Sequence, residues 1–357
     1  MPADIVTVSD LRLALRNPAA LEDLMDREVP QVTVDLSAGG ADRAGSTPGD
    51  LDMLDVASAG RLAALPLVLV GVGEAAAPGT EAAEIVDVAV GTDATAAETV
   101  RRAVAMHPIA SVALALLLRQ AGSRSIAEGL AAESAVYSML QAGEEFAAWR
   151  REQPARQRSP GTEERAVRVK RTADTLHITL SRPLVHNAFN SRMRDELHAA
   201  LMIAAADPSL SVLLSGDGPS FCSGGDLHEF GSRPDPGMAH LVRLRRSVGL
   251  LLASLSDRVE VMLHGSCLGA GIELPAFAGR VTARPGTTIA LPEISLGLIP
   301  GAGGTVSLTR RIGRHRTAYL GLSGDVIGAE VALRWGLVDD VRDPADSRQA
   351  PGGVTCS

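Results

Sequence analysis

Two glutamates in the second half of the chain stand beside glycine-rich sequence. Glu273 ends the segment HGSCLGAGIE, and Glu293 lies twenty residues later, at the second position of PEISLGLIPGAGGT. A third glycine-rich turn, FCSGGDL, begins at Phe221. Glycine-rich backbone bends sharply and lets a ligand approach closely. Carboxylates next to such turns are suited to proton transfer beside a cradle of backbone N–H donors.

The turns around Gly225 and Ala270 each offer one candidate donor. Gly224 and Gly225 follow a short apolar strand, and their flexibility would let the N–H of Gly225 point at a carbonyl oxygen. Ala270 lies where a strand gives way to a helix, and N–H groups at the start of a helix have no intrahelical acceptor. Two converging N–H groups form an oxyanion hole. Taken singly, the Gly225 turn would also be explained as an ordinary loop, since many loops contain Gly-Gly-Asp, and the Ala270 turn by close packing of strand and helix.

Each glutamate has an alternative explanation. Glu273 lies in the apolar context GIELPAF, where burial would raise a carboxyl pKa towards a value useful for proton transfer. Its alternative is a position on the solvent side of the helix. Glu293 follows ALP and would alternatively be a carboxylate at a helix start, stabilised by the helix dipole. The combination of both glutamates with both turns favours a catalytic role.

The bulk composition restricts the class of protein. Of the 357 residues, 46% are apolar and 3% aromatic, and the formal net charge of -8 disfavours non-specific binding to nucleic acid. The three cysteines form no disulfide framework and show no metal-ligand spacing. The N-terminus lacks the pattern of a signal peptide, and no apolar run approaches the roughly 20 residues of a membrane span. We therefore expect a soluble, cytoplasmic protein.

Strands and helices are expected to alternate along the chain, which favours an α/β fold. In the second half, the pattern predicts helices over 191–206, capped by Ser191, over 238–255, and from about Ala270. It predicts strands at 167–180 (with a turn at 172–175), 212–214, 260–263, 281–282 and 288–290. The first half is expected to form strands at 31–36, 65–72 and 85–90, then helices over 94–106, 108–120 and 125–148.

The segment from about residue 165 to 341 resembles the crotonase (enoyl-CoA hydratase/isomerase) superfamily. Besides the three segments above, RPLVHNAFN from Arg182 and SGDVIGAEVALRWGLV from Ser323 carry the resemblance. It implies a β-β-α spiral that binds acyl-CoA thioesters, with the N–H groups of Gly225 and Ala270 as the oxyanion hole and Glu273 and Glu293 as the catalytic pair. The substrate-binding residues that it implies are Ser223, Gly224, Asp226, Leu227, Gly269, Pro300 and Gly301.

The resemblance implies an enoyl-CoA hydratase, which adds water across the 2,3 double bond of a trans-2-enoyl-CoA. Glu273 would activate water for attack at C3 and Glu293 would deliver a proton to C2, with the roles exchanged in the reverse direction. No metal or cofactor is required beyond the coenzyme A of the substrate, and a homo-oligomer, a trimer or a hexamer, is implied. The alternatives are a double-bond isomerase or another CoA-thioester enzyme of this fold, or a catalytically silent acyl-CoA-binding protein.

Two departures from the family pattern concern Ala270 and the C-terminal end. Ala270 stands where the family has a glycine, a modest change if its φ is negative. The family continues with helices beyond the GLV segment, whereas this chain ends at Ser357 after a Pro/Gly-rich tail. Residues 97–146 look similar to those helices, which suggests an arrangement like a circular permutation, with first-half helices covering the site and supplying oligomer contacts. The alternatives are a decayed crotonase-like half at 30–149 and an unrelated helical domain.

The predicted fold class is α/β, a crotonase-like β-β-α spiral preceded by an N-terminal α/β region that ends in a helical segment. The charged, proline-containing sequence at 150–165 is typical of a linker. The predicted parts are an N-terminal α/β region 1–93, a helical segment 94–149, the linker 150–165, the crotonase-like core 166–341 and a disordered tail 342–357.

Overall fold

The computed structural model describes residues 5–37, 54–74, 76, 82–153, 165–232 and 235–343. The chain divides into two compact units. The first consists of Met1–Pro154, Leu291–Pro300 and Leu308–Asp325, and the second of Ala155–Ala290, Gly301–Ser307 and Val326–Ser357. Most of the predicted linker, and the predicted tail from residue 344 on, lie outside the described residues. The predicted domain boundaries stay predictions.

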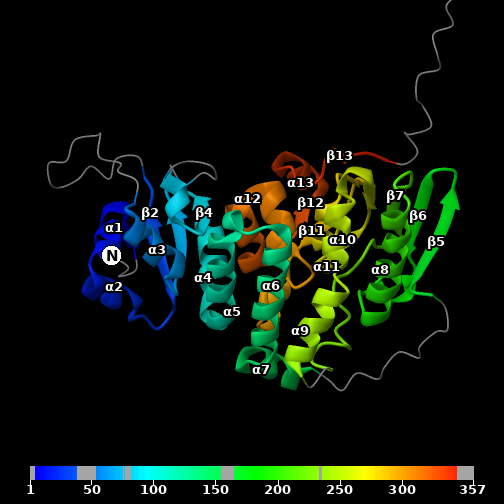
Figure 1. Cartoon of the computed structure of the whole chain (residues 1–357). Helices are drawn as coiled ribbons and strands as arrows, with labels where there is room; N and C mark the ends of the chain where they lie inside the picture. Colours follow the sequence, from blue (N-terminus) through cyan, green and yellow to red (C-terminus); the bar gives the residue numbers. More distant parts are fainter. Residues whose placement is uncertain are drawn as a thin grey trace, which may run out of the picture. The chain divides into compact units, whose positions relative to one another are not determined.

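The first unit begins with a parallel four-stranded sheet in the order β1-β2-β3-β4. Figure 1 shows this part of the chain in blue to cyan. Its core is formed by buried aliphatic side chains such as Leu11, Val34 and Leu69. The predicted strand at 31–36 is confirmed. β3 starts after the predicted residue 65, because Leu65 caps the end of α3, and β4 starts after the predicted residue 85, because Ala82–Ile85 is a 3-10 helix. The elements are β1 (Ile5–Thr7), α1 (Val8–Arg16), α2 (Pro18–Met25), β2 (Gln31–Asp35), α3 (Val56–Ala64), β3 (Val68–Val72) and β4 (Val88–Gly91).

A run of helices follows β4 in the first unit: α4 (Ala94–Met106), α5 (Pro108–Arg119), α6 (Ile126–Gln141) and α7 (Glu144–Glu152). The predictions for 94–106 and 108–120 are confirmed. Pro108 begins α5, where its missing N–H costs no hydrogen bond. The predicted single helix over 125–148 is wrong, because extended backbone at Gly143 separates α6 from α7.

The apolar helices of the first unit are too short to span a membrane singly. Within the described residues, no single helix has both the length and the apolar composition to cross a bilayer. One pair bent by 115°, Ala94–Met106 with Pro108–Ser123, meets these requirements only when its two members are taken together.

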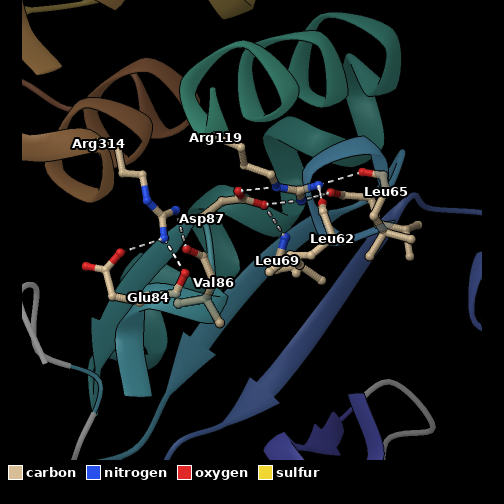
Figure 2. Close-up of polar contacts among 9 residues, drawn as sticks. Leu62, Leu65, Leu69, Glu84, Val86, Asp87, Arg119 and Arg314 are labelled. Carbon is tan, nitrogen blue, oxygen red and sulfur yellow. Dashed lines mark hydrogen bonds and ion pairs between the residues drawn. The ribbon is translucent and has the colours of Figure 1, made fainter. Parts of the chain in front are cut away.

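Arg119, at the end of α5, links the helices to the sheet of the first unit (Figure 2). Its guanidinium donates to both carboxylate oxygens of Asp87, at 2.8 and 2.6 Å. Asp87 also accepts the N–H of Leu69 in β3 at 2.8 Å. The Arg119 and Asp87 side chains are 6% and 3% exposed, so the ion pair is buried. The same guanidinium donates to the carbonyl oxygen of Leu62 in the last turn of α3 and to those of Leu65 and Leu67, between α3 and β3.

Arg314 makes a second link within the first unit (Figure 2). It lies in the later part of α12 (Gly304–Ser323), and its guanidinium donates to the carbonyl oxygen of Val86 at 2.7 Å and to Glu84. Gly313 interrupts α12 with a non-helical φ of 78°. Polar contacts therefore join the run of helices to the sheet through Arg119, and the later part of α12 to the segment before β4 through Arg314.

The second unit contains a six-stranded sheet in the order β13-β10-β8-β7-β6-β5. β5 and β6 form an antiparallel hairpin, and the other neighbours are parallel. A small sheet has the order β12-β11-β9. The strands predicted for this half are confirmed as β5 (Val167–Thr172), β6 (Thr175–Leu180), β7 (Ser211–Gly216), β8 (Val259–Leu263), β10 (Arg280–Ala283) and β11 (Thr288–Ala290). Three short strands were not predicted: β9 (Ser266–Leu268), β12 (Ile327–Gly328) and β13 (Asp340–Val341).

The helices of the second unit correct two predictions. α8 has the predicted bounds, but Asn190 caps it rather than Ser191, since the Asn190 side-chain oxygen accepts the N–H of Met193 at 2.9 Å. The predicted helix over 238–255 is two helices, because Ser247 has extended backbone and caps α10. The helices are α8 (Ser191–Ala206), α9 (Pro236–Arg245), α10 (Val248–Ser254), α11 (Ala270–Glu273) and α13 (Ala329–Trp335).

Candidate active site

The Gly225 turn lies beside the small sheet of the second unit. Cys222 donates its N–H to Ser266 at 3.3 Å, and its carbonyl oxygen accepts the N–H of Leu268 at 3.0 Å, so it pairs with β9. On its other side the turn is tied to Phe189, whose N–H donates to the carbonyl oxygen of Gly224 at 2.8 Å. Backbone hydrogen bonds therefore hold the turn on both sides.

The Gly225 turn and the Ala270 turn lie side by side. Gly224 has a φ of +93°, and a Cβ on it would lie 3.1 Å from the carbonyl oxygen of Leu268. A Cβ on Gly271 would lie 2.2 Å from the carbonyl oxygen of Cys222. Gly269 also has a positive φ, of 48°, and donates its N–H to Ala290 at 3.0 Å. The glycines thus allow two backbone segments to touch where a side chain would keep them apart.

The backbone N–H groups of Gly225 and Ala270, the two predicted donors, are available to bind a ligand. Among the described residues, neither the N–H of Gly225 nor that of Ala270 donates to a protein acceptor. Ala270 is 6% exposed, begins α11 and does not have a positive φ, so alanine fits this position. The ring of Phe230 covers Gly225 on the side where a Cβ would project. An oxyanion hole needs two such N–H donors, and this role of Gly225 and Ala270 stays a prediction.

Glu273 lies one helical turn after Ala270 and is 1% exposed. Its Oε2 atom accepts the N–H groups of Ala302 at 2.7 Å and Gly304 at 2.9 Å. Burial raises the pKa of its carboxyl group to about 7, although the two backbone donors act in the opposite direction. The solvent-facing alternative is therefore wrong. A carboxyl group of this kind can take up or release a proton near neutral pH.

Glu293 lies in the first unit, where it is 8% exposed and begins a 3-10 helix, Glu293–Leu296. Its carbonyl oxygen accepts the N–H of Leu298 at 3.1 Å. Gly297 follows with a φ of +68°, and a Cβ on it would lie 2.7 Å from the Cβ of Glu145 in α7. An arrangement like a circular permutation requires such a contact between the first-half helices and the Glu293 segment. That arrangement stays a prediction.

The other predicted substrate-binding residues are distributed between the two units. Ser223 donates its N–H to the carbonyl oxygen of His186 at 2.9 Å. Asp226 is 7% exposed, and its carboxylate pairs with Arg182 at 2.9 Å, which fixes the turn to the segment before α8. Leu227 is half-buried, Gly301 belongs to the second unit and Pro300 to the first. Contact of any of them with a substrate stays a prediction.

Two contributions to the site were not predicted. Asn187, fully buried with a φ of 54°, donates to the carbonyl oxygens of Asp217 and Ser220 at 2.8 and 2.9 Å and supports the loop before the Gly225 turn. The N–H groups of Ala302 and Gly304 hold the Glu273 carboxylate. The glycine-rich run PGAGG was the signal for these donors, because its backbone N–H groups are accessible to a carboxylate.

A family model described as Enoyl-CoA hydratase/isomerase matches residues 170–348, half of the chain. The chain belongs to the enoyl-CoA hydratase/isomerase family. The match contains both turns and both glutamates, and residues 1–169 precede it. The family and the mixed arrangement of helices and parallel strands together confirm the predicted crotonase-like α/β fold.

Curated relatives of this family are about one-third identical to the chain over the aligned residues. The 2,3-dehydroadipyl-CoA hydratase of Escherichia coli (strain K12) is 36% identical over 174 residues, covering 48% of this chain and 68% of the relative. The mevalonyl-coenzyme A hydratase of Beauveria bassiana is 32% identical, covering 46% of this chain and 62% of the relative. The trans-2-decenoyl-[acyl-carrier-protein] isomerase of Streptococcus mutans is 32% identical, covering 47% of this chain and 65% of the relative.

Solved structures of the same family were also found. A crystal structure of enoyl-CoA hydratase from Thermoplasma volcanium GSS1 is 32% identical with a TM-score of 0.49, covering 52% of this chain and 75% of that chain.

In the described part of this chain, no group of three or more His, Cys, Asp or Glu side chains is placed to hold a metal ion. The prediction that no metal or cofactor is needed stays a prediction.

Proposed function

We propose that this protein hydrates the 2,3 double bond of a trans-2-enoyl-CoA. One observation carries the proposal: the N–H groups of Gly225 and Ala270 lie on adjoining turns, and the buried carboxyl group of Glu273 follows one helical turn later. The family supports a CoA-thioester substrate. Relatives named as hydratases of 2,3-dehydroadipyl-CoA and mevalonyl-coenzyme A support addition of water as the reaction class.

The two turns would stabilise the charge that develops during the reaction. The thioester carbonyl oxygen accepts hydrogen bonds from the N–H groups of Gly225 and Ala270. As the oxygen of water bonds to C3, the π electrons of the C2–C3 bond move toward the carbonyl group and form an enolate. The negative charge then rests on the thioester oxygen, where each donor contributes about 3 kcal/mol of stabilisation to the transition state.

The two glutamates would move the protons. Glu273 takes a proton from the attacking water, and its pKa of about 7 suits a group that must alternate between both protonation states. Glu293 donates a proton to C2, which collapses the enolate and restores the thioester. The net change is the addition of one water molecule, with no oxidation or reduction.

The test is the loss of enoyl-thioester absorbance on addition of enzyme to crotonyl-CoA. We expect Glu273→Gln and Glu293→Gln each to lower kcat by about 10²-fold to 10⁴-fold, in line with the usual size of general acid–base catalysis. Glu330→Gln is the matched control, because Glu330 is exposed on α13. Wild-type activity that survives both substitutions at Glu273 and Glu293 would contradict the proposed roles.

A second candidate is a double-bond isomerase that uses Glu273 alone as a proton shuttle. It is favoured by the isomerase among the relatives and by the presence of Glu273 with both turns in one compact unit. The same assay separates the two functions, since a 3-enoyl-CoA gains the conjugated absorbance on isomerisation. In that case Glu273→Gln abolishes turnover and Glu293→Gln does not. The homo-oligomer and the cytoplasmic location stay predictions under either function.

A further inference from the structure

Glu145, in the first turn of α7, reaches across to the start of α5. Its two carboxylate oxygens accept the N–H groups of Ile109 at 2.7 Å and Ala110 at 3.1 Å. His107, the residue before α5, makes no side-chain cap of its own. Glu145 therefore supplies the cap of α5 from another helix, and it places a negative charge at the positive end of the α5 dipole.

The backbone of the same residue lies against the Glu293 turn. A Cβ on Gly297 would lie 2.7 Å from the Cβ of Glu145, 2.8 Å from its carbonyl carbon and 2.9 Å from the nitrogen of Phe146. The first turn of α7 and Gly297 are thus in direct contact, with no room for a side chain on Gly297. Phe146 anchors this turn of α7, since it is 3% exposed and stacks on Trp149 at 5.6 Å between ring centroids.

Gly297 in turn closes the loop that carries Glu293. The N–H of Gly297 donates to the carbonyl oxygen of Ile294 at 2.9 Å, and the next N–H, that of Leu298, donates to the carbonyl oxygen of Glu293 at 3.1 Å. A shift of α7 relative to α5 would press on Gly297 or leave it unsupported. Either change would move the backbone of Glu293, because these two hydrogen bonds join them within a few residues.

We infer that Glu145 is a positioning residue: by holding α7 to the start of α5 it fixes Gly297, and through it the placement of Glu293. This inference rests on the proposed role of Glu293 in proton transfer. It assigns to the first half of the chain an indirect part in the reaction, through a residue that precedes the family match.

The test compares Glu145→Ala with Glu144→Ala. Alanine at 145 keeps the Cβ that touches Gly297 and removes only the carboxylate. Glu144 is the matched control, because it lies in the same turn of α7 and its exposed side chain pairs with Arg151. Two readouts are measured at a temperature where all variants are folded: amide hydrogen exchange in the peptide that spans 293–298, and kcat and KM for enoyl-CoA hydration.

For Glu145→Ala we expect faster exchange at Gly297 and Leu298 and a fall in kcat of about 10-fold to 100-fold, as is usual for a displaced catalytic group, with KM changed less than about two-fold. Glu145→Gln keeps an acceptor oxygen and should recover part of the loss. Gly297→Ala changes the other partner of the contact with α7 and should lower kcat in the same way. Glu144→Ala should change neither readout.

Unchanged exchange, or unchanged kcat, in a folded Glu145→Ala protein would overturn the inference. The inference would also be overturned if activity fell only in proportion to the fraction of unfolded protein, because that result would mean that Glu145 has a purely structural role. If the wild type hydrates no enoyl-CoA, the proposed function fails. The exchange at Gly297 and Leu298 then still decides whether Glu145 fixes this turn.

Discussion

The Oε2 atom of Glu273 lies 2.7 Å from the backbone nitrogen of Ala302. This hydrogen bond, with a second from Gly304, keeps a carboxyl group in place that is almost completely removed from water. Burial disfavours the charged form more than the two donors favour it, so the pKa rises from about 4.5 to about 7. The group is therefore close to half-ionised at neutral pH, and both stability and activity should depend on its titration.

The stability of the protein should fall as the pH rises through 7. Because the pKa of Glu273 is higher in the folded than in the unfolded chain, its contribution is complete below about pH 4.5 and is lost as the pH passes about 7. The shift corresponds to at most about 3 kcal/mol in the free energy of unfolding. Urea denaturation of wild type and Glu273→Gln between pH 5 and pH 8.5 measures it. A constant difference between the two proteins over this range would contradict the expectation.

The rate of hydration should rise with pH through the same value. A base accepts a proton only when ionised, so kcat for crotonyl-CoA should increase as Glu273 loses its proton near pH 7. The measurement is a pH–rate profile of the wild type. A profile that stays flat between pH 5.5 and pH 8.5, with chemistry rate-limiting, would show that Glu273 is not the base.

The contact between the two turns should tolerate no side chain on Gly271. Alanine there would place its Cβ 2.2 Å from the carbonyl oxygen of Cys222, so α11 must move away from the Gly225 turn. We expect a loss of about 1–3 kcal/mol in unfolding free energy, typical of overpacking, and at least about a 10-fold loss in kcat as the two N–H donors separate. Ala270→Gly is the control, because it adds no atoms and should retain most of the activity. Equal activities of the two variants would refute the contact.

The buried ion pair of Arg119 and Asp87 should stabilise the first unit strongly. Replacing Arg119 by alanine leaves a buried carboxylate without its partner, which typically costs about 3–5 kcal/mol. Arg101→Ala, which removes an exposed ion pair with Glu98 on α4, is the control and should leave the unfolding midpoint unchanged. Thermal unfolding monitored by circular dichroism compares them, and similar midpoints would argue against the link drawn in Figure 2.

Cys222 and Cys267 should resist alkylation in the folded protein. Burial raises the pKa of the Cys222 thiol to about 12 and raises that of Cys267 as well, and the thiolate is the reactive form. Iodoacetamide at pH 8, followed by peptide mass spectrometry, should modify both only after denaturation. Rapid labelling of Cys222 in the native protein would indicate that the Gly225 turn opens.

Local sequence signals were enough to locate the turns, and they were not enough to describe what surrounds them. Glycines near 225 and 270 are required by close backbone contacts, so their pattern predicted the turns correctly. The donors to Glu273 come from Ala302 and Gly304, 29 and 31 residues away along the chain, and only the folded chain brings them together. The cap of α8 was wrong by one residue, because Asn190 and Ser191 are both good capping residues and their spacing alone does not choose between them.

The helices of the first half also show what local sequence signals cannot predict. The apolar pattern over 125–148 continues through Gly143, yet the backbone turns there and α7 folds back to hold α5 and Gly297. Helical periodicity reports which face is buried, and it does not report what that face is buried against. The contact of Glu145 with the Glu293 turn joins residues about 150 positions apart, so no local signal could predict it.

The first unit is assembled from three separate stretches, two of which lie inside the family match. A gene fragment trimmed to residues 170–348 would carry Leu291–Pro300 and Leu308–Asp325 without the sheet and helices of their own unit. Side chains that are fully buried in the whole chain, such as Leu298, Ile299 and Leu320, would then be exposed to solvent. Such a fragment should aggregate on expression, because the boundary of homology in this protein is not a boundary of folding.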